Sequence, residues 1–366
     1  MPTKKCYIDT DVYTEAKKRI RRIVLAFDSV VVCFSGGKDS LAALHLVQEV
    51  YDEMGIKKKL LVIFRDEELI PDDVINFVID IRNSGKYNFR YYAIPLQGDK
   101  FIMGKTYKYV QWDRERKWLR QPPEFAITLP PDQYKVYDQY SADTFICKEE
   151  KGKVALITGI RADESLTRFR ACVNKQNENY INATKDPRIH ICKPLYDWTE
   201  NDIFLYFYKK KITYCPIYDV QILNGEGLRV STPLHAESAK RFSKVKTRYP
   251  VFYQQLVDLF PEMKVQDRYY TQIDKGGGAD YSGYEHTFDG LVQYINDRLD
   301  DPVIREKMLE RVERAWSTRQ NKIRKGATNL GGYPLRYLFA CVDNGYYKRE
   351  IMPKGYPNKL DYDFEK

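Results

Sequence analysis

The sequence predicts an α/β protein, in which a parallel twisted sheet carries helices on both faces and is followed by a mostly helical C-terminal region. Short apolar runs recur along the first half of the chain, at Val30–Phe34, Leu60–Phe64, Arg90–Leu96 and Val154–Ile160. Continuous runs of this kind that alternate with helical patterns are typical of parallel strands buried on both faces. Ligands of such sheets bind beyond the carboxyl ends of the strands, so the residues after each run are the first candidates for a site.

Helix signals separate these runs. Pro71 and the two aspartates that follow it suit the first turn of a helix, which we expect to end near Asn83. Thr199 begins a later helix in the manner of a capping box, with Asp202 three residues further on. Strand and helix signals therefore alternate as the predicted fold requires.

The chain of 366 residues is long enough for two domains. Helical patterns predominate from about residue 234, and the clearest runs from Pro302 to Lys325. We place a boundary near residue 235, which gives an α/β domain over residues 1–235 and a mostly helical region over residues 236–366. The segment at about 97–153 is too long for an ordinary loop, and we interpret it as an insertion. A lid over a substrate and a peripheral subdomain without a catalytic part are both open interpretations of it.

The most informative motif follows the first apolar run and reads Ser35-Gly36-Gly37-Lys38-Asp39-Ser40. A strand, a tight glycine turn and a helix N-terminus form an anion site, because backbone N–H groups converge there and the helix dipole adds about half a positive charge. Gly36 and Gly37 permit positive φ and leave room for phosphate oxygens. Ser35 and Ser40 add hydroxyl donors. Lys38 adds a cation, and Asp39 adds a carboxylate that can hold Mg²⁺ against the phosphates.

We interpret this hexapeptide as a nucleotide pyrophosphate site, with a corner that uses Gly-Gly for geometry alone as the alternative. A second segment, Gly104-Lys105-Thr106, resembles part of a Walker loop. Its spacer from Gly98 is one residue too long, and no strand directly precedes Gly104, so we do not assign it a phosphate-binding role.

The formal net charge of the chain is +9, and basic residues cluster at 17–22, 57–59, 209–211, 240–248 and 319–325. Such an excess suits an anionic partner, from a nucleotide up to nucleic acid. Each cluster taken alone also fits a solvated helix face. A DNA or RNA partner is therefore one of two open interpretations of the charge.

The seven cysteines are scattered, odd in number and never spaced Cys-x-x-Cys. This distribution argues against a disulfide framework and favours the reduced cytoplasm, although a cluster assembled from distant cysteines stays open. The first residues lack the apolar stretch of a signal peptide, and no run approaches the roughly 18 apolar residues of a membrane span. We therefore expect a cytoplasmic protein with no membrane partner.

Three ordered motifs resemble the PP-loop ATP pyrophosphatase superfamily and, more narrowly, the phosphoadenosine phosphosulfate (PAPS) reductase family. The first is the hexapeptide, whose Lys-containing form is typical of sulfonucleotide enzymes. The second is Gly159–Arg168, similar to the family's Gly-x-Arg-x-x-Glu-Ser-x-x-Arg segment. The third runs from Lys193 through Trp198 to Asp219 and is similar to the family's Pro-Leu-x-x-Trp and Pro-x-Tyr signatures. The resemblance covers roughly residues 28–220.

The resemblance implies an adenine nucleotide alpha hydrolase-like fold that binds ATP with Mg²⁺, or a sulfonucleotide. In that interpretation the hexapeptide holds the β,γ-pyrophosphate, and Arg161 with Arg168 holds the α-phosphate or the acceptor. The expected metal ligands are Asp39 and Glu67. The expected catalytic residues are Lys38, Asp39, Arg161 and Arg168. The expected nucleotide-binding residues are Ser35, Gly36, Gly37, Lys38, Asp39, Ser40, Phe64, Asp66, Gly159, Arg161, Glu164 and Ser165.

The departures from the family limit the chemistry. PAPS reductases that use thioredoxin carry a cysteine in a Glu-Cys-Gly-x-His-type segment, and Cys341 lacks that context. The Cys-Cys and Cys-x-x-Cys pairs of adenylyl-sulfate reductases are absent as well. We therefore do not expect a thiol-dependent PAPS reductase.

The expected activity is Mg²⁺-dependent cleavage of ATP to AMP and pyrophosphate, which activates an acceptor. The layout resembles PAPS reductase-like proteins of prophages, described as co-activators of gene expression, and the ATP pyrophosphatases of DNA phosphorothioation. The resemblance implies DNA, a ParB-like protein or a sulfur-donating cysteine desulfurase as partners. Two other interpretations stay open: a nucleotide- or sulfonucleotide-binding regulator, and a sulfate adenylyltransferase small subunit that would need a GTPase partner.

Overall fold

The protein divides into two compact units, Met1–Gln266 and Asp267–Lys366. The structure is a computed structural model, and it describes residues 8–173, 180–224, 227–239, 242–274, 281, 283–326, 330–354 and 359–365.

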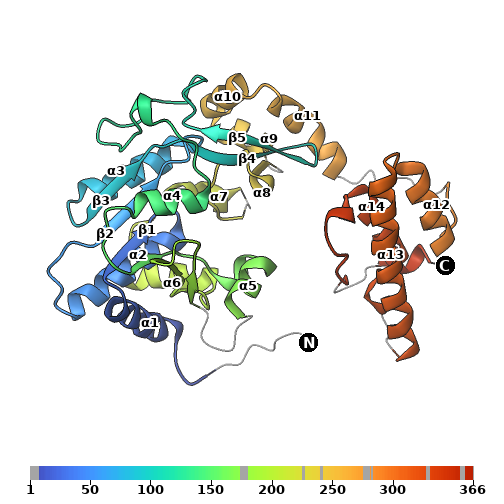
Figure 1. Cartoon of the computed structure of the whole chain (residues 1–366), viewed down its shortest axis with the longest axis horizontal. Coiled ribbons are helices and arrows are strands. Elements are labelled where there is room, and N and C mark those ends of the chain that lie inside the picture. Colours follow the sequence, from blue (N-terminus) through green and yellow to red (C-terminus); the bar gives the residue numbers. More distant parts are fainter. Residues whose placement is uncertain are drawn as a thin grey trace. The chain divides into compact units, whose positions relative to one another are not determined.

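A six-stranded sheet in the order β3-β2-β1-β6-β8-β7 forms the centre of the first unit (Figure 1). Its strands are β1 Ser29–Cys33, β2 Leu61–Arg65, β3 Asn88–Tyr92, β6 Val154–Ile157, β7 Ile181–Ala183 and β8 Ile189–Cys192. All neighbouring pairs are parallel except β7, which runs antiparallel to β8 at the edge. This confirms the predicted parallel α/β fold. The chain proceeds outward from β1 to β3 and then returns to the other side of β1, so the strand order reverses between β1 and β6.

Side chains of alternate strand residues enter two separate cores, as the period of two in a strand requires. Val30 and Val32 pack on one face with four helices, whereas Val31 and Ile63 pack on the other face with α4 and the start of the hairpin. The helices of the first face are α1 Val12–Ala26, α2 Lys38–Glu53, α3 Asp72–Asn83 and α6 Glu200–Lys210, and α4 spans Gln139–Ile146. Helices therefore cover both faces of the sheet, as predicted.

The predicted insertion at 97–153 contains an antiparallel hairpin, a long connection and α4. The hairpin pairs β4 Leu96–Ile102 with β5 Lys105–Gln111, and Met103 and Gly104 form its turn with φ of +48° and +85°. The Gly104-Lys105-Thr106 segment is therefore a hairpin turn and strand start, and not a strand-to-helix phosphate loop. The α4 helix is the crossover that leads the chain from β3 to β6.

The helices between residue 235 and Gln266 pack on this hairpin. Tyr109 of β5 shares a core with Leu234, Phe242, Leu256 and other apolar residues of the following helices. Those helices are α8 Ala236–Ala239, α9 Phe242–Arg248, α10 Pro250–Leu259 and the start of α11, which spans Met263–Asp274. The first compact unit accordingly continues past the predicted boundary near residue 235, to Gln266.

The second unit is helical, in agreement with the prediction for the C-terminal region. Its core includes Leu291, Met308, Val312, Leu338 and Phe339, which come from three helices. Those are α12 Phe288–Arg298, α13 Pro302–Arg324 and α14 Leu335–Asp343, and α15 covers Lys359–Asp363. The remaining short elements of the two units are α5 Leu166–Val173, α7 Ile217–Leu223, and the 3₁₀ turns Pro131–Gln133, Ala162–Glu164, Leu330–Gly332 and Tyr346–Lys348.

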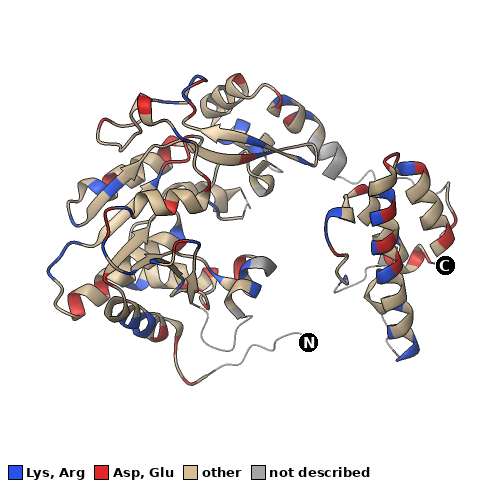
Figure 2. Ribbon diagram, in the orientation of Figure 1, with Lys and Arg blue, Asp and Glu red and all other residues tan. Residues whose placement is uncertain are grey.

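Several of the predicted basic clusters carry acidic partners. On α1, Lys17 and Arg21 both pair with Glu53. On α13, Arg319 pairs with Glu365, and Figure 2 shows basic and acidic residues mixed along this helix. The pairs on α1 fit a solvated helix face. Among the described residues, no helix is long and apolar enough to cross a membrane.

Glu68, just beyond β2, anchors the inserted segment to the sheet. Its fully buried carboxylate accepts two hydrogen bonds from Arg116, at 2.7 and 2.5 Å, and the backbone N–H of Trp112 donates to it at 2.6 Å. A second backbone N–H, that of Leu119, donates at 3.1 Å. A buried carboxylate with this many donors holds the connection after β5 against the end of β2.

Replacing Glu68 with Gln should lower the free energy of unfolding by about 2–3 kcal/mol, because Arg116 loses its charged partner in a largely buried position. Urea unfolding of the full chain measures this change. The matched control is Glu115→Gln, an exposed residue of the same segment, which should change the stability by less than about 0.5 kcal/mol. Equal effects of the two substitutions would contradict the anchoring role.

Candidate functional site

The loop after β1 has the geometry of an anion-binding turn. Gly36 has a φ of +75°, and a Cβ there would lie 2.7 Å from Val74 Cγ1 of α3. Gly37 is the N-cap residue of α2, so Lys38, Asp39 and Ser40 form the first turn of the helix. Only glycine suits position 36, because it combines a left-handed backbone with close packing against a neighbouring helix.

Backbone donors converge in this turn. The Ser40 hydroxyl donates to the carbonyl of Gly37 at 2.9 Å and accepts from the N–H of Ser35 at 3.1 Å, which closes the loop. Within the described part of the chain, the backbone N–H groups of Gly36, Gly37, Asp39 and Ser40 have no hydrogen-bond acceptor. Free N–H groups at the positive end of a 16-residue helix are the donors that a phosphate group needs.

The loop after β6 touches this turn directly. A Cβ on Gly159 would lie 2.4 Å from the carbonyl carbon of Asp39 and 2.5 Å from the backbone nitrogen of Ser40. Gly159 therefore lets the two loops meet at the point where the strand order reverses, which is where open α/β sheets bind their ligands. The residues that follow two of the predicted strands therefore lie together, at the edge of the sheet where the sequence predicted a site.

Asp39 lies between two cations. Its Oδ1 accepts from Arg161 Nε at 2.7 Å, and its Oδ2 accepts from Lys38 Nζ at 3.1 Å. Both cationic side chains are buried, with about 3% of each residue exposed. Arg161 also donates to Asp163 at 2.7 Å, and Lys38 lies 3.3 Å from Glu200. The loops thus concentrate two cations beside the free N–H groups and balance them with carboxylates.

The charge of Arg161 is well supported. Burial opposes the guanidinium charge, but the carboxylates of Asp39, Asp163 and Glu164 together raise the pKa of Arg161. Glu164 also accepts the backbone N–H of Arg161 at 3.0 Å. Arg161 is therefore a fixed cation at the meeting point of the two loops.

Tyr218 is a site residue to which the sequence analysis assigned no role. Its buried hydroxyl accepts the backbone N–H of Lys38 at 2.7 Å, and its oxygen would lie 3.3 Å from a Cβ on Gly37. Lys38 Nζ additionally donates to the carbonyl of Leu228 at 3.0 Å. The Pro-x-Tyr signature at Pro216 to Tyr218 was the available signal for Tyr218, whereas no local pattern indicates Leu228 or Glu200.

The described contacts of Arg168 and Ser165 are within their own segment and not with the phosphate loop. Arg168 pairs with Glu164, and 43% of its side chain is exposed. The Ser165 hydroxyl accepts the backbone N–H of Arg168 at 3.2 Å, as in a helix cap. Glu164 therefore links Arg168 to Arg161, but no described contact joins Arg168 to Lys38 or Asp39.

Phe64 and Asp66, both predicted to bind the nucleotide, are interior residues. The Phe64 ring packs on Tyr91 in the first core with no exposed surface. The Asp66 carboxylate accepts from Tyr91 at 2.5 Å and from Arg120 at 2.6 Å, and it is also fully buried. These described contacts of the two residues are therefore with the neighbouring strand β3 and with the inserted segment.

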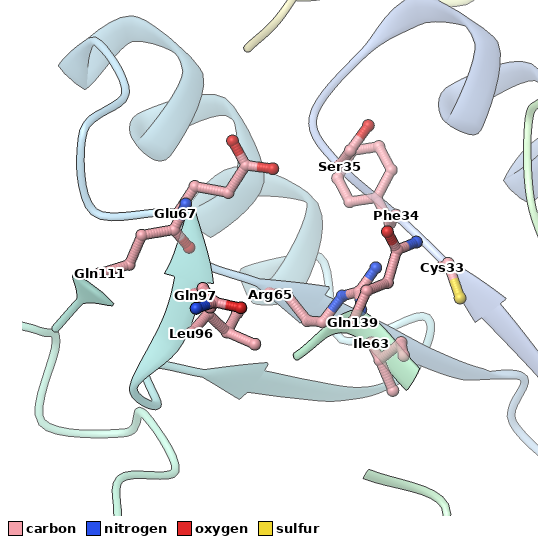
Figure 3. Close-up of a pocket in the computed structure, with 10 residues that line it drawn as sticks. All are labelled: Cys33, Phe34, Ser35, Ile63, Arg65, Glu67, Leu96, Gln97, Gln111 and Gln139. Carbon is pink, nitrogen blue, oxygen red and sulfur yellow. The ribbon is translucent and has the colours of Figure 1, made fainter. Parts of the chain in front are cut away.

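Glu67 has different surroundings from Asp66. It lines a cavity of about 240 Å³ at the carboxyl ends of β1 and β2 (Figure 3). Burial raises the pKa of Glu67, against the opposing effects of Arg65 and of the Thr232 backbone N–H. The residues that line this cavity are Cys33, Phe34, Ser35, Ile63, Arg65, Glu67, Leu96, Gln97, Gln111 and Gln139.

Neither a metal cluster nor a disulfide occurs in the described ranges. No group of three or more His, Cys, Asp or Glu side chains is arranged to hold a metal ion there. Six cysteines in these ranges are free thiols, and Cys6 lies outside them. Burial raises the pKa of Cys192 and of Cys341 to about 12, so neither has the character of a reactive thiolate.

Comparison with known families agrees with the geometry. Residues 29–224, more than half of the chain, match the phosphoadenosine phosphosulfate reductase domain. The chain therefore belongs to this family and, with it, to the PP-loop superfamily, as the motifs predicted. The matched residues include both loops of the site and Tyr218.

Individual relatives are more distant. The uncharacterized protein YbdN of Escherichia coli (strain K12) is 30% identical over 240 residues, which cover 62% of this chain and 58% of YbdN. Among solved structures, FMN adenylyltransferase of Candida glabrata with FAD and pyrophosphate is 15% identical, with a TM-score of 0.38, and the match covers 57% of this chain and 58% of that one. PAPS reductase of Candida auris is 14% identical, with a TM-score of 0.36, over 56% of this chain and 84% of that one. These structural similarities are too low to assign an activity.

Replacing Gly159 with Ala should displace the first turn of α2, because the added Cβ would overlap backbone atoms that cannot rotate away. We expect a loss of about 1–3 kcal/mol in the free energy of unfolding and at least about tenfold weaker binding of pyrophosphate. Urea unfolding and calorimetric titration with pyrophosphate measure the two effects. Gly283→Ala is the control, since a Cβ there meets no atom within 4 Å. Unchanged pyrophosphate binding in Gly159→Ala would show that the two loops do not form one site.

Proposed function

We propose that the protein is a Mg²⁺-dependent ATP pyrophosphatase, in which an acceptor attacks the α-phosphorus of ATP, pyrophosphate leaves, and the adenylylated acceptor then releases AMP when a second nucleophile attacks it. The observation that supports this proposal most is the pairing of free N–H groups at the start of α2 with two buried cations, Lys38 and Arg161. Membership in the PAPS reductase domain family supports a nucleotide as the ligand of that arrangement.

Attack on the α-phosphorus moves negative charge onto the leaving pyrophosphate, so the site must stabilise charge on both sides of the scissile bond. The N–H groups of Gly36 and Gly37 and the ammonium of Lys38 are the donors for the pyrophosphate side. Arg161, on the adjoining loop, is the donor for the α-phosphate. Asp39, held between Lys38 and Arg161, keeps both cations in place before the phosphates engage them.

The donor set also fits a magnesium ion. Mg²⁺ commonly binds one or two carboxylates together with substrate phosphates. Asp39 is the carboxylate that the loop itself carries, and a carboxylate has acceptor positions beyond the two that Lys38 and Arg161 occupy. Asp39 would hold the ion with phosphate oxygens, and the second predicted ligand, Glu67, lines the cavity beside Ser35. When bound, the ion would neutralise charge that develops on the pyrophosphate.

Thiol-dependent reduction of a sulfonucleotide is not part of the proposal. Cys341, the last cysteine of the chain, is buried in the core of the second unit, and its high pKa disfavours the thiolate. In this proposal the acceptor is activated by adenylation, and any sulfur would come from a partner such as a cysteine desulfurase. DNA and a ParB-like protein stay predictions for the acceptor and partner.

Incubation of the full chain with Mg²⁺ and α-labelled ATP, with and without DNA, should produce labelled AMP together with pyrophosphate. Lys38→Ala should slow this release by about 10²–10³-fold, because it removes one charged donor from the developing pyrophosphate. Lys58→Ala, which changes an exposed lysine, is the matched control and should leave the rate unchanged. ATP binding without any AMP would contradict the proposal and favour a nucleotide-binding regulator.

A further inference from the structure

The ammonium group of Lys38 is surrounded by acceptors of the protein itself. An ammonium donates three hydrogen bonds. Within the described residues, Lys38 Nζ lies 3.1 Å from Asp39 Oδ2, 3.0 Å from the carbonyl oxygen of Leu228 and 3.3 Å from Glu200 Oε2. These three acceptors match the three donors. A phosphate oxygen can therefore bind Lys38 only if one of the acceptors gives way.

Two of the three acceptors are held in place by further hydrogen bonds. The carboxylate of Asp39 is bound on its other side by Arg161 Nε at 2.7 Å. The carbonyl of Leu228 directly precedes Arg229, whose backbone N–H and carbonyl are both bound by the buried Gln221 side chain, at 2.9 and 2.7 Å. Movement of either acceptor would leave buried polar groups without partners, which is costly.

Glu200 is the acceptor that can be exchanged. It is the first residue of α6, and 45% of its side chain is exposed. In the part of the chain that the structure describes, Lys38 is the one ion-pair partner of its carboxylate. A displaced Glu200 carboxylate enters water and stays at the positive end of α6, where a negative charge is favoured. Since exposed ion pairs contribute little free energy, this exchange costs little.

The start of α6 keeps Glu200 beside the phosphate loop. Thr199 and Asp202 form a capping box, in which each side chain accepts the backbone N–H of the other residue, at 3.3 and 2.7 Å. The ring of Trp198, just before them, is buried, and its indole N–H donates to the carbonyl of Val12 at 3.0 Å. The helix itself packs beside α2 in a shared core (Figure 1). Rotation of the side chain alone can therefore move the Glu200 carboxylate away from the lysine and back.

We propose that Glu200 holds the place of the pyrophosphate. Its carboxylate binds Lys38 when no phosphate is bound, gives way to a phosphate oxygen when the nucleotide binds, and returns to Lys38 as pyrophosphate leaves. This inference rests on the proposed function, since it concerns the donor for the leaving pyrophosphate. Glu200 thus competes with pyrophosphate for one cation, which keeps Lys38 paired and favours release of the product.

The test is calorimetric titration of the full chain with pyrophosphate in the presence of Mg²⁺. Glu200→Gln, which keeps the size of the side chain and removes its charge, should bind pyrophosphate about three- to tenfold more tightly than the wild-type chain. Lys38→Ala should bind it more weakly. Loss of a residue that only supports the fold would not increase the affinity, so a gain is specific to competition.

Matched variants separate competition at Lys38 from general charge repulsion. Glu200→Asp keeps the charge but shortens the side chain by one methylene, which withdraws the carboxylate from Lys38, and it should also bind pyrophosphate more tightly than the wild-type chain. Asp219→Asn removes an exposed carboxylate of α7 whose described partner is the Tyr214 hydroxyl, at 2.9 Å. Its affinity for pyrophosphate should stay within about twofold of the wild-type value, because water and salt screen an exposed charge. Circular dichroism confirms that each variant is folded.

The outcomes distinguish the inference from the proposed function. Unchanged or weaker binding by Glu200→Gln, together with weaker binding by Lys38→Ala, would overturn the place-holding role and leave the phosphate site intact. A gain in Glu200→Gln without a gain in Glu200→Asp would indicate charge repulsion and would also overturn the inference. Binding that Lys38→Ala leaves unchanged, or no binding by either the wild-type chain or Glu200→Gln, would overturn both.

Discussion

The contact between the loops after β1 and β6 is the constraint on which the candidate site depends. Gly159 approaches the first turn of α2 so closely that any side chain would overlap the backbone of Asp39 and Ser40. This approach lets Arg161 reach Asp39 at 2.7 Å from the neighbouring strand. The sheet supports it, because β1 and β6 are parallel neighbours and both deliver their following residues to the same edge. Without this contact, a phosphate-binding turn and a buried arginine would be separate features of the fold.

Electrostatic balance explains how so much positive charge can be buried. Lys38 and Arg161 are both almost inaccessible, and unpaired burial of either would be very costly. Asp39 contacts both, and Asp163 and Glu200 each contact one of them. Pairing with carboxylates therefore makes the cations compatible with the folded state, and phosphate oxygens offer the same type of partner. In this way the site is preorganised for an anion.

The sequence was sufficient to predict the sheet, its helices on both faces and the two loops, because each depends on local signals. Apolar runs and glycines predicted the strands and turns, and the family motif predicted Arg161. Tyr218 and Leu228 were missed because their contacts with Lys38 join segments far apart in the chain. The sequence could not show that Asp66 is bound in the interior whereas Glu67 lines a cavity. This difference depends on the hydrogen bonds that Tyr91 and Arg120 donate to Asp66. The extension of the first unit past residue 235 likewise depends on packing around Tyr109, which no local pattern reveals.

The central claim is that the two loops together bind the phosphates of a nucleotide. The most direct measurement is a crystal structure of the full chain with the α,β-methylene analogue of ATP. The account predicts phosphate oxygens within hydrogen-bond distance of the Gly36 and Gly37 N–H groups, with Lys38 and Arg161 engaged. Phosphates bound elsewhere, with the contacts of Lys38 and Arg161 to Asp39 unchanged, would contradict it.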